Sequence, residues 1–328
     1  MEEELRLRLN THRVVPSTPS PGIAGDARAG LLQQPRSMPP KYFYDERGSR
    51  LFDAICDTPE YYPTRMEERL LQNHALEIVR RARPDHILEF GSGTARKTRH
   101  LFDACELEGW HSAYWPFDVC EAMLEESGRS LLQRYEWLEV NALVGDYLGG
   151  LRAMPRPQGN CLYVFLGGTI GNFSERQARA FLAELRALMR PGDRLLLGAD
   201  RLKDAGVLHA AYNDAAGLTA AFNLNLLRVL NRELDADFRP EAFAHCACFN
   251  QDEQQVEMYL VSRHRQRVRL AELGVVLDFA AGERIQTEIS RKFTADGLET
   301  LLSSAGLAVA HHFEAGDGWF SLLLARPD

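Results

Sequence analysis

The chain has 328 residues, of which 45% are hydrophobic and 26% charged, as in an ordinary globular protein of one large or two modest domains. The net charge of −8 argues against a general binder of nucleic acid or membrane surfaces. No apolar run is long enough to span a membrane, and the start Met-Glu-Glu-Glu is unlike a signal peptide. Six cysteines without paired spacing indicate reduced thiols, so we expect a cytoplasmic protein.

The first 38 residues are expected to be a flexible lead-in. Residues 1–12 are charged and fit a short strand or helix, whereas residues 13–38 are rich in proline, serine, glycine and alanine. Residues 39–65 are instead dense in aromatic side chains, including four tyrosines. These rings either form the core of a small subdomain or line a polar pocket, and the pattern alone is compatible with both interpretations.

Strands then alternate with helices. Apolar spacing predicts a helix over 66–81 and strands over 85–90, 113–118, 138–144, 162–166 and 193–200. Helical segments lie between the strands, among them 121–134 and one that a capping box at Ser174–Gln177 begins and that runs to about residue 190. This alternation predicts a parallel, doubly wound sheet, which is an α/β fold.

The alternation is interrupted over 201–291. Strands are expected there over 243–249, 255–262 and 268–273, which indicates an inserted α+β domain. A helix over 295–305 and strands over 307–313 and 319–325 then return to the first pattern. We therefore expect a sheet domain made of 66–200 and 292–328, and a substrate-recognition domain made of 39–65 and 201–291.

A glycine-rich turn follows the first of these strands. Glu89 lies near the end of the strand, and Gly91-Ser92-Gly93 leads toward a helix start. P-loops and dinucleotide-binding loops both need glycine where Arg96 stands. S-adenosylmethionine carries no phosphate, and its positive charge suits the acid before the loop. An ordinary strand–helix turn would show the same local pattern.

Acids also end the next two predicted strands. Asp118 lies at the end of the second, where a carboxylate binds ribose hydroxyls in nucleoside-binding α/β folds. Asp146 follows the third strand, within reach of an adenine amine. Acids after three neighbouring strands favour S-adenosylmethionine over NAD or ATP. The closing pair of strands matches the way the seven-stranded, Rossmann-like sheet of S-adenosylmethionine-dependent methyltransferases ends.

Six segments carry a resemblance to a known family. They are 39–49, 59–65, 166–173, 211–214, 222–225 and 287–290, with motifs such as Pro-Glu-Tyr-Tyr-Pro-Thr-Arg and Leu-Gly-Gly-Thr-Ile-Gly-Asn-Phe. Together they resemble the histidine Nα-methyltransferases that make hercynine for ergothioneine biosynthesis. The resemblance extends from Pro39 to the end of the chain.

The resemblance implies two sets of site residues. The cofactor set is Gly91, Lys97, Asp118, Asp146 and Tyr147, to which the loop pattern adds Glu89, Ser92 and Gly93. The substrate set is Tyr44, Tyr61, Gly167, Asn172, Tyr212, Met258, Glu288 and Ser290. Within it, Tyr61, Asn172 and Tyr212 are expected to hold the amino-acid head group, and Glu288 and Ser290 the imidazole ring.

The chemistry of the last pair agrees with this role. Glu288 and Ser290 are two residues apart and would share one face of a strand, where a carboxylate and a hydroxyl could serve the two ring nitrogens. Met258 would be an apolar wall beside the ring. An isolated pair of this kind is more often a solvated strand surface, so the surrounding motifs decide in favour of a site.

The expected reaction is trimethylation of the α-amino group of L-histidine, which releases S-adenosylhomocysteine. The alternatives are methylation of another amino acid, such as a tryptophan derivative, and a non-catalytic S-adenosylmethionine-binding protein. We assign no general base and expect no metal, because strand alternation explains His245-Cys246-Ala247-Cys248 better than a ligand cluster does. We expect small-molecule partners, no nucleic acid or membrane partner, and a chain compatible with a monomer.

Overall fold

The computed structural model describes residues 7–15, 21–149 and 151–328. The parts of the expected lead-in at 1–6 and 16–20 lie outside the described residues. The chain forms two compact units. We call Met1–Pro19, Pro63–Arg201 and Phe293–Asp328 the sheet unit, and Ser20–Tyr62 with Leu202–Lys292 the inserted unit. The inserted unit includes residues 20–38, which were expected in the lead-in. The division of cofactor and substrate binding between two domains stays a prediction.

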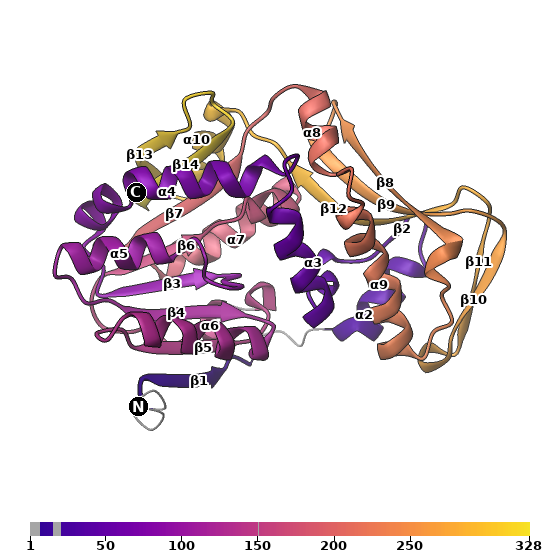
Figure 1. Cartoon of the computed structure of the whole chain (residues 1–328), viewed down its shortest axis with the longest axis horizontal. Coiled ribbons are helices and arrows are strands. Elements are labelled where there is room, and N and C mark those ends of the chain that lie inside the picture. Colours follow the sequence, from indigo (N-terminus) through magenta and orange to yellow (C-terminus); the bar gives the residue numbers. More distant parts are fainter. Residues whose placement is uncertain (1–6, 16–20, 150) are drawn as a thin grey trace. The chain divides into compact units, whose positions relative to one another are not determined.

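The sheet unit contains an eight-stranded sheet among its described residues, in the order β1-β5-β4-β3-β6-β7-β14-β13. Strands β1 to β7 of this sheet pair in parallel, whereas β14 is antiparallel to both β7 and β13. Figure 1 shows β3, β4 and β5 side by side. The strands are β1 Leu9–Arg13, β3 His86–Phe90, β4 Ala113–Asp118, β5 Val140–Val144, β6 Cys161–Phe165, β7 Arg194–Asp200, β13 Leu307–Glu314 and β14 Phe320–Pro327.

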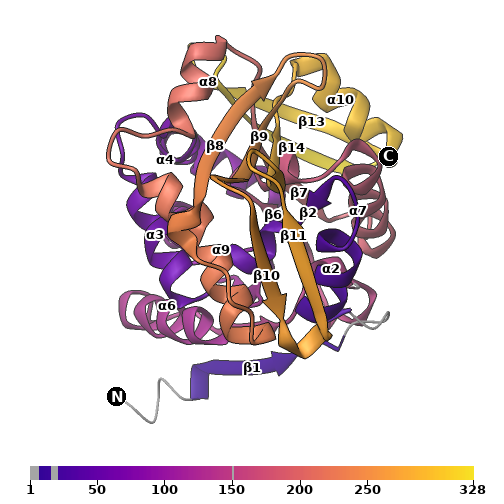
Figure 2. The same cartoon turned by 90° about the vertical axis from the view of Figure 1, so that its right-hand side faces the viewer.

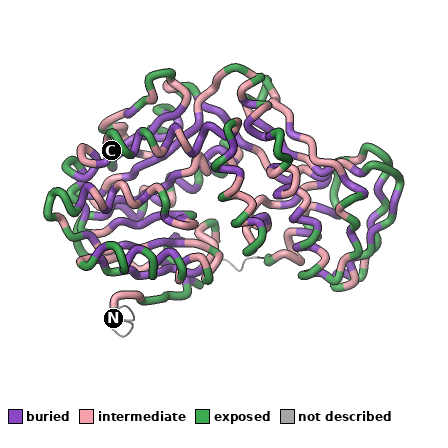
Figure 3. Tube along the Cα trace, in the orientation of Figure 1, coloured by how far each residue is buried: buried purple, intermediate pink, exposed green. Residues whose placement is uncertain are grey.

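Helices cover both faces of this sheet. Helices α7 (Glu175–Leu188) and α10 (Ala295–Ser304) share one apolar core with Phe117, Leu143 and Leu197. On the other face, α6 (Glu121–Arg134) packs through Leu124, α5 (Arg99–Leu107) through Phe102, and α4 (Tyr62–Ala82) lies against β7. All five residues of β6 are buried, as expected for a central parallel strand, and the buried trace follows the strands in Figure 3.

Helix α7 shows how the sequence sets an element boundary. The Ser174 hydroxyl accepts a hydrogen bond from the Gln177 backbone N–H, and the Gln177 side chain accepts one from the Ser174 N–H at 2.9 Å. This capping box satisfies backbone donors that the first helical turn leaves unpaired. Buried residues then recur at helical spacing, which turns one face of the helix onto the sheet: Ala178, Phe181, Leu182, Leu185 and Leu188.

The inserted unit has a four-stranded sheet in the order β2-β12-β9-β8 and a separate β10–β11 pair among its described residues. Figure 2 shows β8, β9 and the β10–β11 pair. Its strands are β2 Arg36–Ser37, β8 Phe243–Asn250, β9 Gln255–Ser262, β10 Gln266–Leu270, β11 Val275–Phe279 and β12 Arg284–Arg291. Its helices are α2 Gly22–Leu31, α3 Glu46–Cys56, α8 Ala205–Ala211 and α9 Leu218–Leu234. An α+β insertion was expected.

Three features differ from the expectation. The large sheet has an eighth strand, because β1 pairs in parallel with β5 at the edge. Strand β1 overlaps the short strand or helix expected over 1–12, whereas α2 and β2 lie where a flexible lead-in was expected. The strand expected over 268–273 ends at Leu270, a 3₁₀ turn (Ala271–Leu273) follows, and β11 then pairs back onto β10.

Candidate functional site

The expected cofactor residues gather where three parallel strands end. Phe90 of β3 is in register with Phe117 of β4, and Asp118 of β4 with Val144 of β5. Two further backbone hydrogen bonds hold the segments that leave the strands, from Gly91 N to Phe117 O at 2.8 Å and from Gly145 N to Asp118 O at 3.0 Å. The carboxyl ends of parallel strands are where open α/β sheets bind ligands.

The loop after β3 has a backbone that favours glycine. The φ angles of Gly91 and Gly93 are +69° and +49°, in the left-handed region. A Cβ atom placed on Gly93 would have no heavy atom within 4 Å, so the space beside this residue is open. A loop that is bare on one side, next to a carboxylate, fits the close approach of a nucleoside-type ligand such as S-adenosylmethionine.

That carboxylate is Asp118, and its orientation is fixed by the backbone. Its Oδ2 accepts a hydrogen bond from Gly93 N at 3.2 Å, and its Oδ1 accepts one from Cys120 N at 3.0 Å. Burial raises the pKa of Asp118 above its usual value, and the backbone hydrogen bonds act in the opposite direction. Each oxygen has a second lone pair, which can accept a ribose hydroxyl.

Tyr147 and Asp146 follow β5 at the same edge. The Tyr147 ring lies among aromatic rings, with centroid distances of 5.9 Å to Phe90 and 6.1 Å to Phe117. Asp146 accepts a hydrogen bond from the backbone N–H of Leu148 at 2.9 Å. Both residues therefore have defined positions, and their contact with an adenine ring stays a prediction.

Glu89 differs from the other two acids. Its carboxylate is 4% exposed and accepts hydrogen bonds from the Thr98 hydroxyl, at 2.6 Å, and from the Tyr114 hydroxyl. Burial raises the pKa of Glu89 to about 7, and these two hydrogen bonds oppose that shift. Glu89 thus ties β3 to β4 and to the residue before α5. Its role as a direct cofactor contact stays a prediction.

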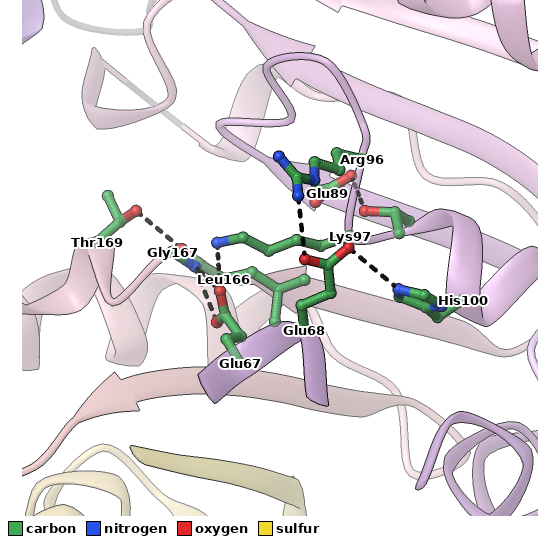
Figure 4. A network of polar contacts seen from close by, with 10 residues as sticks. Glu67, Glu68, Glu89, Arg96, Lys97, His100, Leu166, Gly167 and Thr169 are labelled. Atoms are coloured by element: carbon green, nitrogen blue, oxygen red, sulfur yellow. Dashed lines mark hydrogen bonds and ion pairs between the residues drawn. The ribbon is translucent and has the colours of Figure 1, made fainter. Parts of the chain in front are cut away.

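A buried acid that the sequence analysis missed organises the other side of the loop. Glu67 of α4 is fully buried, forms an ion pair with Lys97, and accepts the Gly167 N–H at 2.9 Å on each of its oxygens (Figure 4). Gly198 leaves room for this carboxylate, because a Cβ there would lie 1.9 Å from Glu67 Oε1. Glu67 therefore positions one expected cofactor residue and one expected substrate residue.

The neighbouring acid has a weaker role. Glu68 lies 3.4 Å from Arg96 and 3.7 Å from His100, and the Arg96 side chain is 49% exposed (Figure 4). Arg96, which stands where a phosphate-binding loop would need glycine, thus lies at the surface of the loop. In the sequence, Glu67 and Glu68 look alike, as two polar residues of a helix, and only the fold shows that Glu67 is fully buried and Glu68 partly exposed.

In the inserted unit, β12 carries the pair expected to bind the ring. Glu288 is opposite Met258 of β9, and Ser290 is opposite Val256, so Glu288 and Ser290 share one face of the strand. Met258 is 2% exposed, which suits an apolar wall. Glu288 is partly buried; burial raises its pKa to about 7, and the charge of Lys292 opposes the shift.

Tyr212 lies directly beside this pair. Its hydroxyl donates to Ser290 Oγ at 2.8 Å. Lys292, which the sequence analysis also missed, donates to Ser290 Oγ at 2.8 Å and to the Tyr212 hydroxyl at 3.0 Å, and it is 3% exposed. Two residues expected in different parts of the substrate pocket therefore share one hydrogen-bond network.

A second network fixes the backbone around these groups. His245 Nε2 lies 2.9 Å from the Tyr212 carbonyl oxygen, so this nitrogen carries the hydrogen, and Nδ1 accepts from the Asn223 amide at 2.9 Å. The Asn223 amide oxygen accepts from the Thr287 hydroxyl at 2.8 Å. Burial lowers the pKa of His245, which agrees with a neutral ring. The network links α9, β8 and β12 to Tyr212, the residue that follows α8.

The expected aromatic residues pack on one another. Tyr44 makes edge contacts with Phe52 and Phe222, at 5.6 and 5.5 Å between ring centroids. Tyr61 makes edge contacts with Phe52 at 6.1 Å and Tyr212 at 6.2 Å. Burial raises the pKa of Tyr61, so its phenol stays neutral. The rings form a packed cluster that includes three residues of the expected substrate set.

The expected substrate set is divided between the units. Gly167 and Asn172 belong to the sheet unit, and Asn172 is a partly buried residue of the 3₁₀ turn Thr169–Asn172. The other six residues belong to the inserted unit: Tyr44, Tyr61, Tyr212, Met258, Glu288 and Ser290. The structure brings four of these six, Tyr44, Tyr61, Tyr212 and Ser290, into the contacts described above with one another or through Phe52. The other two, Met258 and Glu288, are opposite each other on β9 and β12. Histidine contact by the whole set stays a prediction.

Other candidate groups show no site. Within residues 7–15, 21–149 and 151–328, no group of three or more His, Cys, Asp or Glu side chains is arranged to hold a metal ion. His245, Cys246 and Cys248 alternate along β8, as expected. The six cysteines all lie in the described part of the chain, where no disulfide joins them. Among the described helices, none is long and apolar enough to cross a membrane.

A parallel sheet with a glycine-rich loop after one strand and an acid at the end of the next is the arrangement found in nucleoside-binding α/β proteins. The family model described as histidine-specific methyltransferase, SAM-dependent, matches residues 23–327, and the chain belongs to this family.

Curated relatives agree with the family model. The chain is 46% identical over 300 residues to the histidine N-alpha-methyltransferase of Mycolicibacterium smegmatis. The aligned region covers 92% of this chain and 93% of the relative. The chain is 45% identical over 299 residues to the enzyme of the same name from Mycobacterium tuberculosis, which covers 90% and 93%. It is 31% identical over 305 residues to the ergothioneine biosynthesis protein 1 of Neurospora crassa, covering 89% of this chain and 33% of that protein.

Proposed function

We propose that the chain transfers three methyl groups from S-adenosylmethionine to the α-amino group of L-histidine, which gives hercynine for ergothioneine biosynthesis. The observation that carries the proposal is the pairing of Glu288 and Ser290 on one face of β12, opposite Met258, in a member of the histidine-specific family. A polar ring with two nitrogens matches a carboxylate and a hydroxyl two residues apart.

The sheet unit supports binding of the methyl donor. Gly93 leaves open space beside the loop, and Asp118 presents an oriented carboxylate at the end of β4. Lys97 is held by Glu67, and Tyr147 offers an aromatic surface after β5. We infer that Asp118 binds the ribose hydroxyls and that Asp146 and Tyr147 contact the adenine.

The inserted unit supports binding of the amino acid. Glu288 accepts a hydrogen bond from the ring N–H, Ser290 serves the second ring nitrogen, and Met258 lies beside the ring. An indole ring has no second nitrogen, so it would leave one of these buried polar groups unpaired. A site built in this way discriminates against such an analogue by up to about 10⁴-fold.

The bound methyl donor supplies an electrophile that its sulfonium charge already activates. The protein's contribution is to align the neutral amine with the methyl carbon and to exclude water. The amine nitrogen forms a bond to the methyl carbon as the carbon–sulfur bond breaks, and the amine loses one proton for each methyl gained before the final tertiary amine is alkylated. Aromatic faces such as those of Tyr44 and Tyr61 can tolerate the quaternary ammonium product.

The test is incubation of the protein with S-adenosylmethionine and a panel of single amino acids, followed by mass spectrometry. We expect histidine to gain three CH₂ units and tryptophan to gain none. A panel in which histidine stays unmodified would contradict the proposal, and trimethylated tryptophan would replace it with the related activity on another amino acid. A small-molecule reaction in the cytoplasm, without a metal or macromolecular partner, is part of the proposal.

A further inference from the structure

Lys292 is the buried cation next to the proposed ring site. It follows β12 directly, is 3% exposed, and donates hydrogen bonds to Ser290 Oγ and to the Tyr212 hydroxyl, at 2.8 and 3.0 Å. Burying an ammonium group is costly unless its donors are satisfied. An uncharged side chain would fill the same space at a lower desolvation cost. We therefore expect the charge at this position to have a function.

The contacts of Lys292 determine how the Ser290 hydroxyl is used. A hydroxyl has one hydrogen and two acceptor lone pairs. Ser290 Oγ accepts one hydrogen bond from Lys292 and one from the Tyr212 hydroxyl, both at 2.8 Å. Lys292 has only hydrogens to offer and cannot accept one, so it forces Ser290 to be the acceptor on that side. With both lone pairs occupied, the Ser290 hydrogen is available to a third partner.

Ser290 shares one face of β12 with Glu288, so a third partner of its hydroxyl would meet both side chains. A carboxylate there accepts a hydrogen bond, whereas the oriented Ser290 hydroxyl donates one. The two groups thus have opposite polarity and form an ordered acceptor–donor pair. A neutral imidazole, with one N–H and one unprotonated nitrogen, has the complementary order.

We propose that Lys292 is a positioning residue that determines specificity by holding the Ser290 hydroxyl as a donor. The site then selects a ring with an N–H toward Glu288 and an unprotonated nitrogen toward Ser290. A fully protonated imidazolium would direct a second N–H against the Ser290 hydrogen and is excluded. This inference rests on the proposed function and adds the tautomer and protonation state that the site recognises.

The test compares histidine with an alanine that carries a pyrrole ring, in which C–H replaces the unprotonated nitrogen and the N–H is kept. The variants are Lys292→Met, Ser290→Ala and the double variant, and kcat and KM are measured for both substrates. We expect each single variant to raise the KM of histidine about tenfold while leaving that of the pyrrole analogue nearly unchanged. The double variant should be no worse than Ser290→Ala alone, because Lys292 acts through Ser290.

Lys203→Met is the matched control. Lys203 also belongs to the inserted unit and donates to a tyrosine hydroxyl, that of Tyr62, at 2.8 Å. We expect it to leave the preference for histidine over the pyrrole analogue unchanged. Binding of S-adenosylhomocysteine, measured by calorimetry, should be the same in all variants and shows that each protein is folded. If Lys292→Met does not fold, Lys292→Gln is used instead. We then expect a smaller rise in the KM of histidine, again with little change for the pyrrole analogue.

Two results would overturn the inference. One is an equal loss with histidine and the pyrrole analogue, which indicates a purely structural role for Lys292. The other is a double variant whose loss is the product of the single losses, which indicates independent action. Either result leaves the proposed function intact, whereas a wild-type protein that methylates neither substrate removes the proposed function itself.

Discussion

At the scale of single residues, the two neighbouring acids of α4 differ in burial although they look alike in the sequence. Glu67 is fully buried against Lys97 and the Gly167 N–H, whereas Glu68 has looser contacts with Arg96 and His100 (Figure 4). Removing one partner of a buried pair is strongly destabilising, whereas a pair with a partly exposed member such as Arg96 contributes little.

We therefore predict that Glu67→Gln lowers the free energy of unfolding by about 3 kcal/mol. The matched change Glu68→Gln should cost less than about 1 kcal/mol. Glu67→Gln should also weaken S-adenosylhomocysteine binding, because it releases Lys97. Urea denaturation and calorimetry measure both effects. Equal losses of stability in the two variants would contradict the role given to Glu67.

Glu89 gives a prediction for pH dependence. Burial raises its pKa from 4.5 to about 7 in the folded protein. Between about pH 4.5 and 7 the folded chain therefore binds more protons than the unfolded chain, and the free energy of unfolding falls as the pH rises. The contribution is present below pH 4.5 and is lost by about pH 7, with a total of about 3 kcal/mol.

Glu89→Gln cannot ionise, so it should lack this part of the pH dependence. We expect the wild type to lose about 3 kcal/mol relative to Glu89→Gln between pH 4.5 and pH 8, measured by urea denaturation at several pH values. Parallel stability curves for the two proteins would show that the buried carboxyl does not titrate in this range.

The sequence predicts residues with their own chemical pattern better than residues that act through others. Asp118 and Ser290 were assigned from strand ends, spacing and motif resemblance, and the structure places them beside Gly93 and Tyr212. Glu67 and Lys292 were missed because their importance depends on contacts across 30 and 80 residues of chain, with Lys97 and Tyr212. Only folding brings those partners together.

At the scale of elements, we expect the loop after β3 to determine access of the methyl donor. Gly93 and Gly109 both have positive φ angles, +49° and +63°, and a Cβ at either would have no heavy atom within 4 Å. They belong to the same unit, but only Gly93 lies in the loop next to Asp118. A side chain at either position would therefore cause the same backbone strain. Only at Gly93 do we expect it also to contact the ligand.

We predict that Gly93→Ala and Gly109→Ala each lower the free energy of unfolding by about 1 kcal/mol, because an L-residue is strained at positive φ. Gly93→Ala alone should weaken S-adenosylhomocysteine binding at least about tenfold, since its methyl group occupies the space meant for the ligand. Calorimetric titration of both variants decides this. A Gly93→Ala protein with wild-type affinity would place the ligand elsewhere.

Elements with a strong repeating pattern were predicted well, and paired edges were not. The α6 helix matches the expected 121–134, and α7 begins at its capping box. By contrast, β1 (Leu9–Arg13) is mostly exposed and is a strand only because it pairs with β5. Likewise, β11 exists through its pairing with β10. For β1, the local sequence does not indicate its partner β5, which is distant in the chain.

At the scale of the whole molecule, one chain combines a common parallel sheet with an insertion that we expect to recognise the substrate. The sheet unit contains the strand ends and the loop that we expect to bind the methyl donor, and the inserted unit contains the Glu288–Ser290 pair. The sequence indicates an insertion because helix–strand alternation stops at residue 201 and returns after residue 291. Pairing order within each sheet had to come from the structure.

The central claim is that the methyl groups go to the α-nitrogen of histidine, and the position of the methyl groups in the product tests it most directly. The protein is incubated with histidine and S-adenosylmethionine carrying a ¹³C-labelled methyl group, and the product is examined by nuclear magnetic resonance. We predict a single labelled methyl resonance that correlates with the histidine α-carbon. Labelled methyl groups that correlate with the imidazole carbons, or histidine that remains unlabelled, would contradict it.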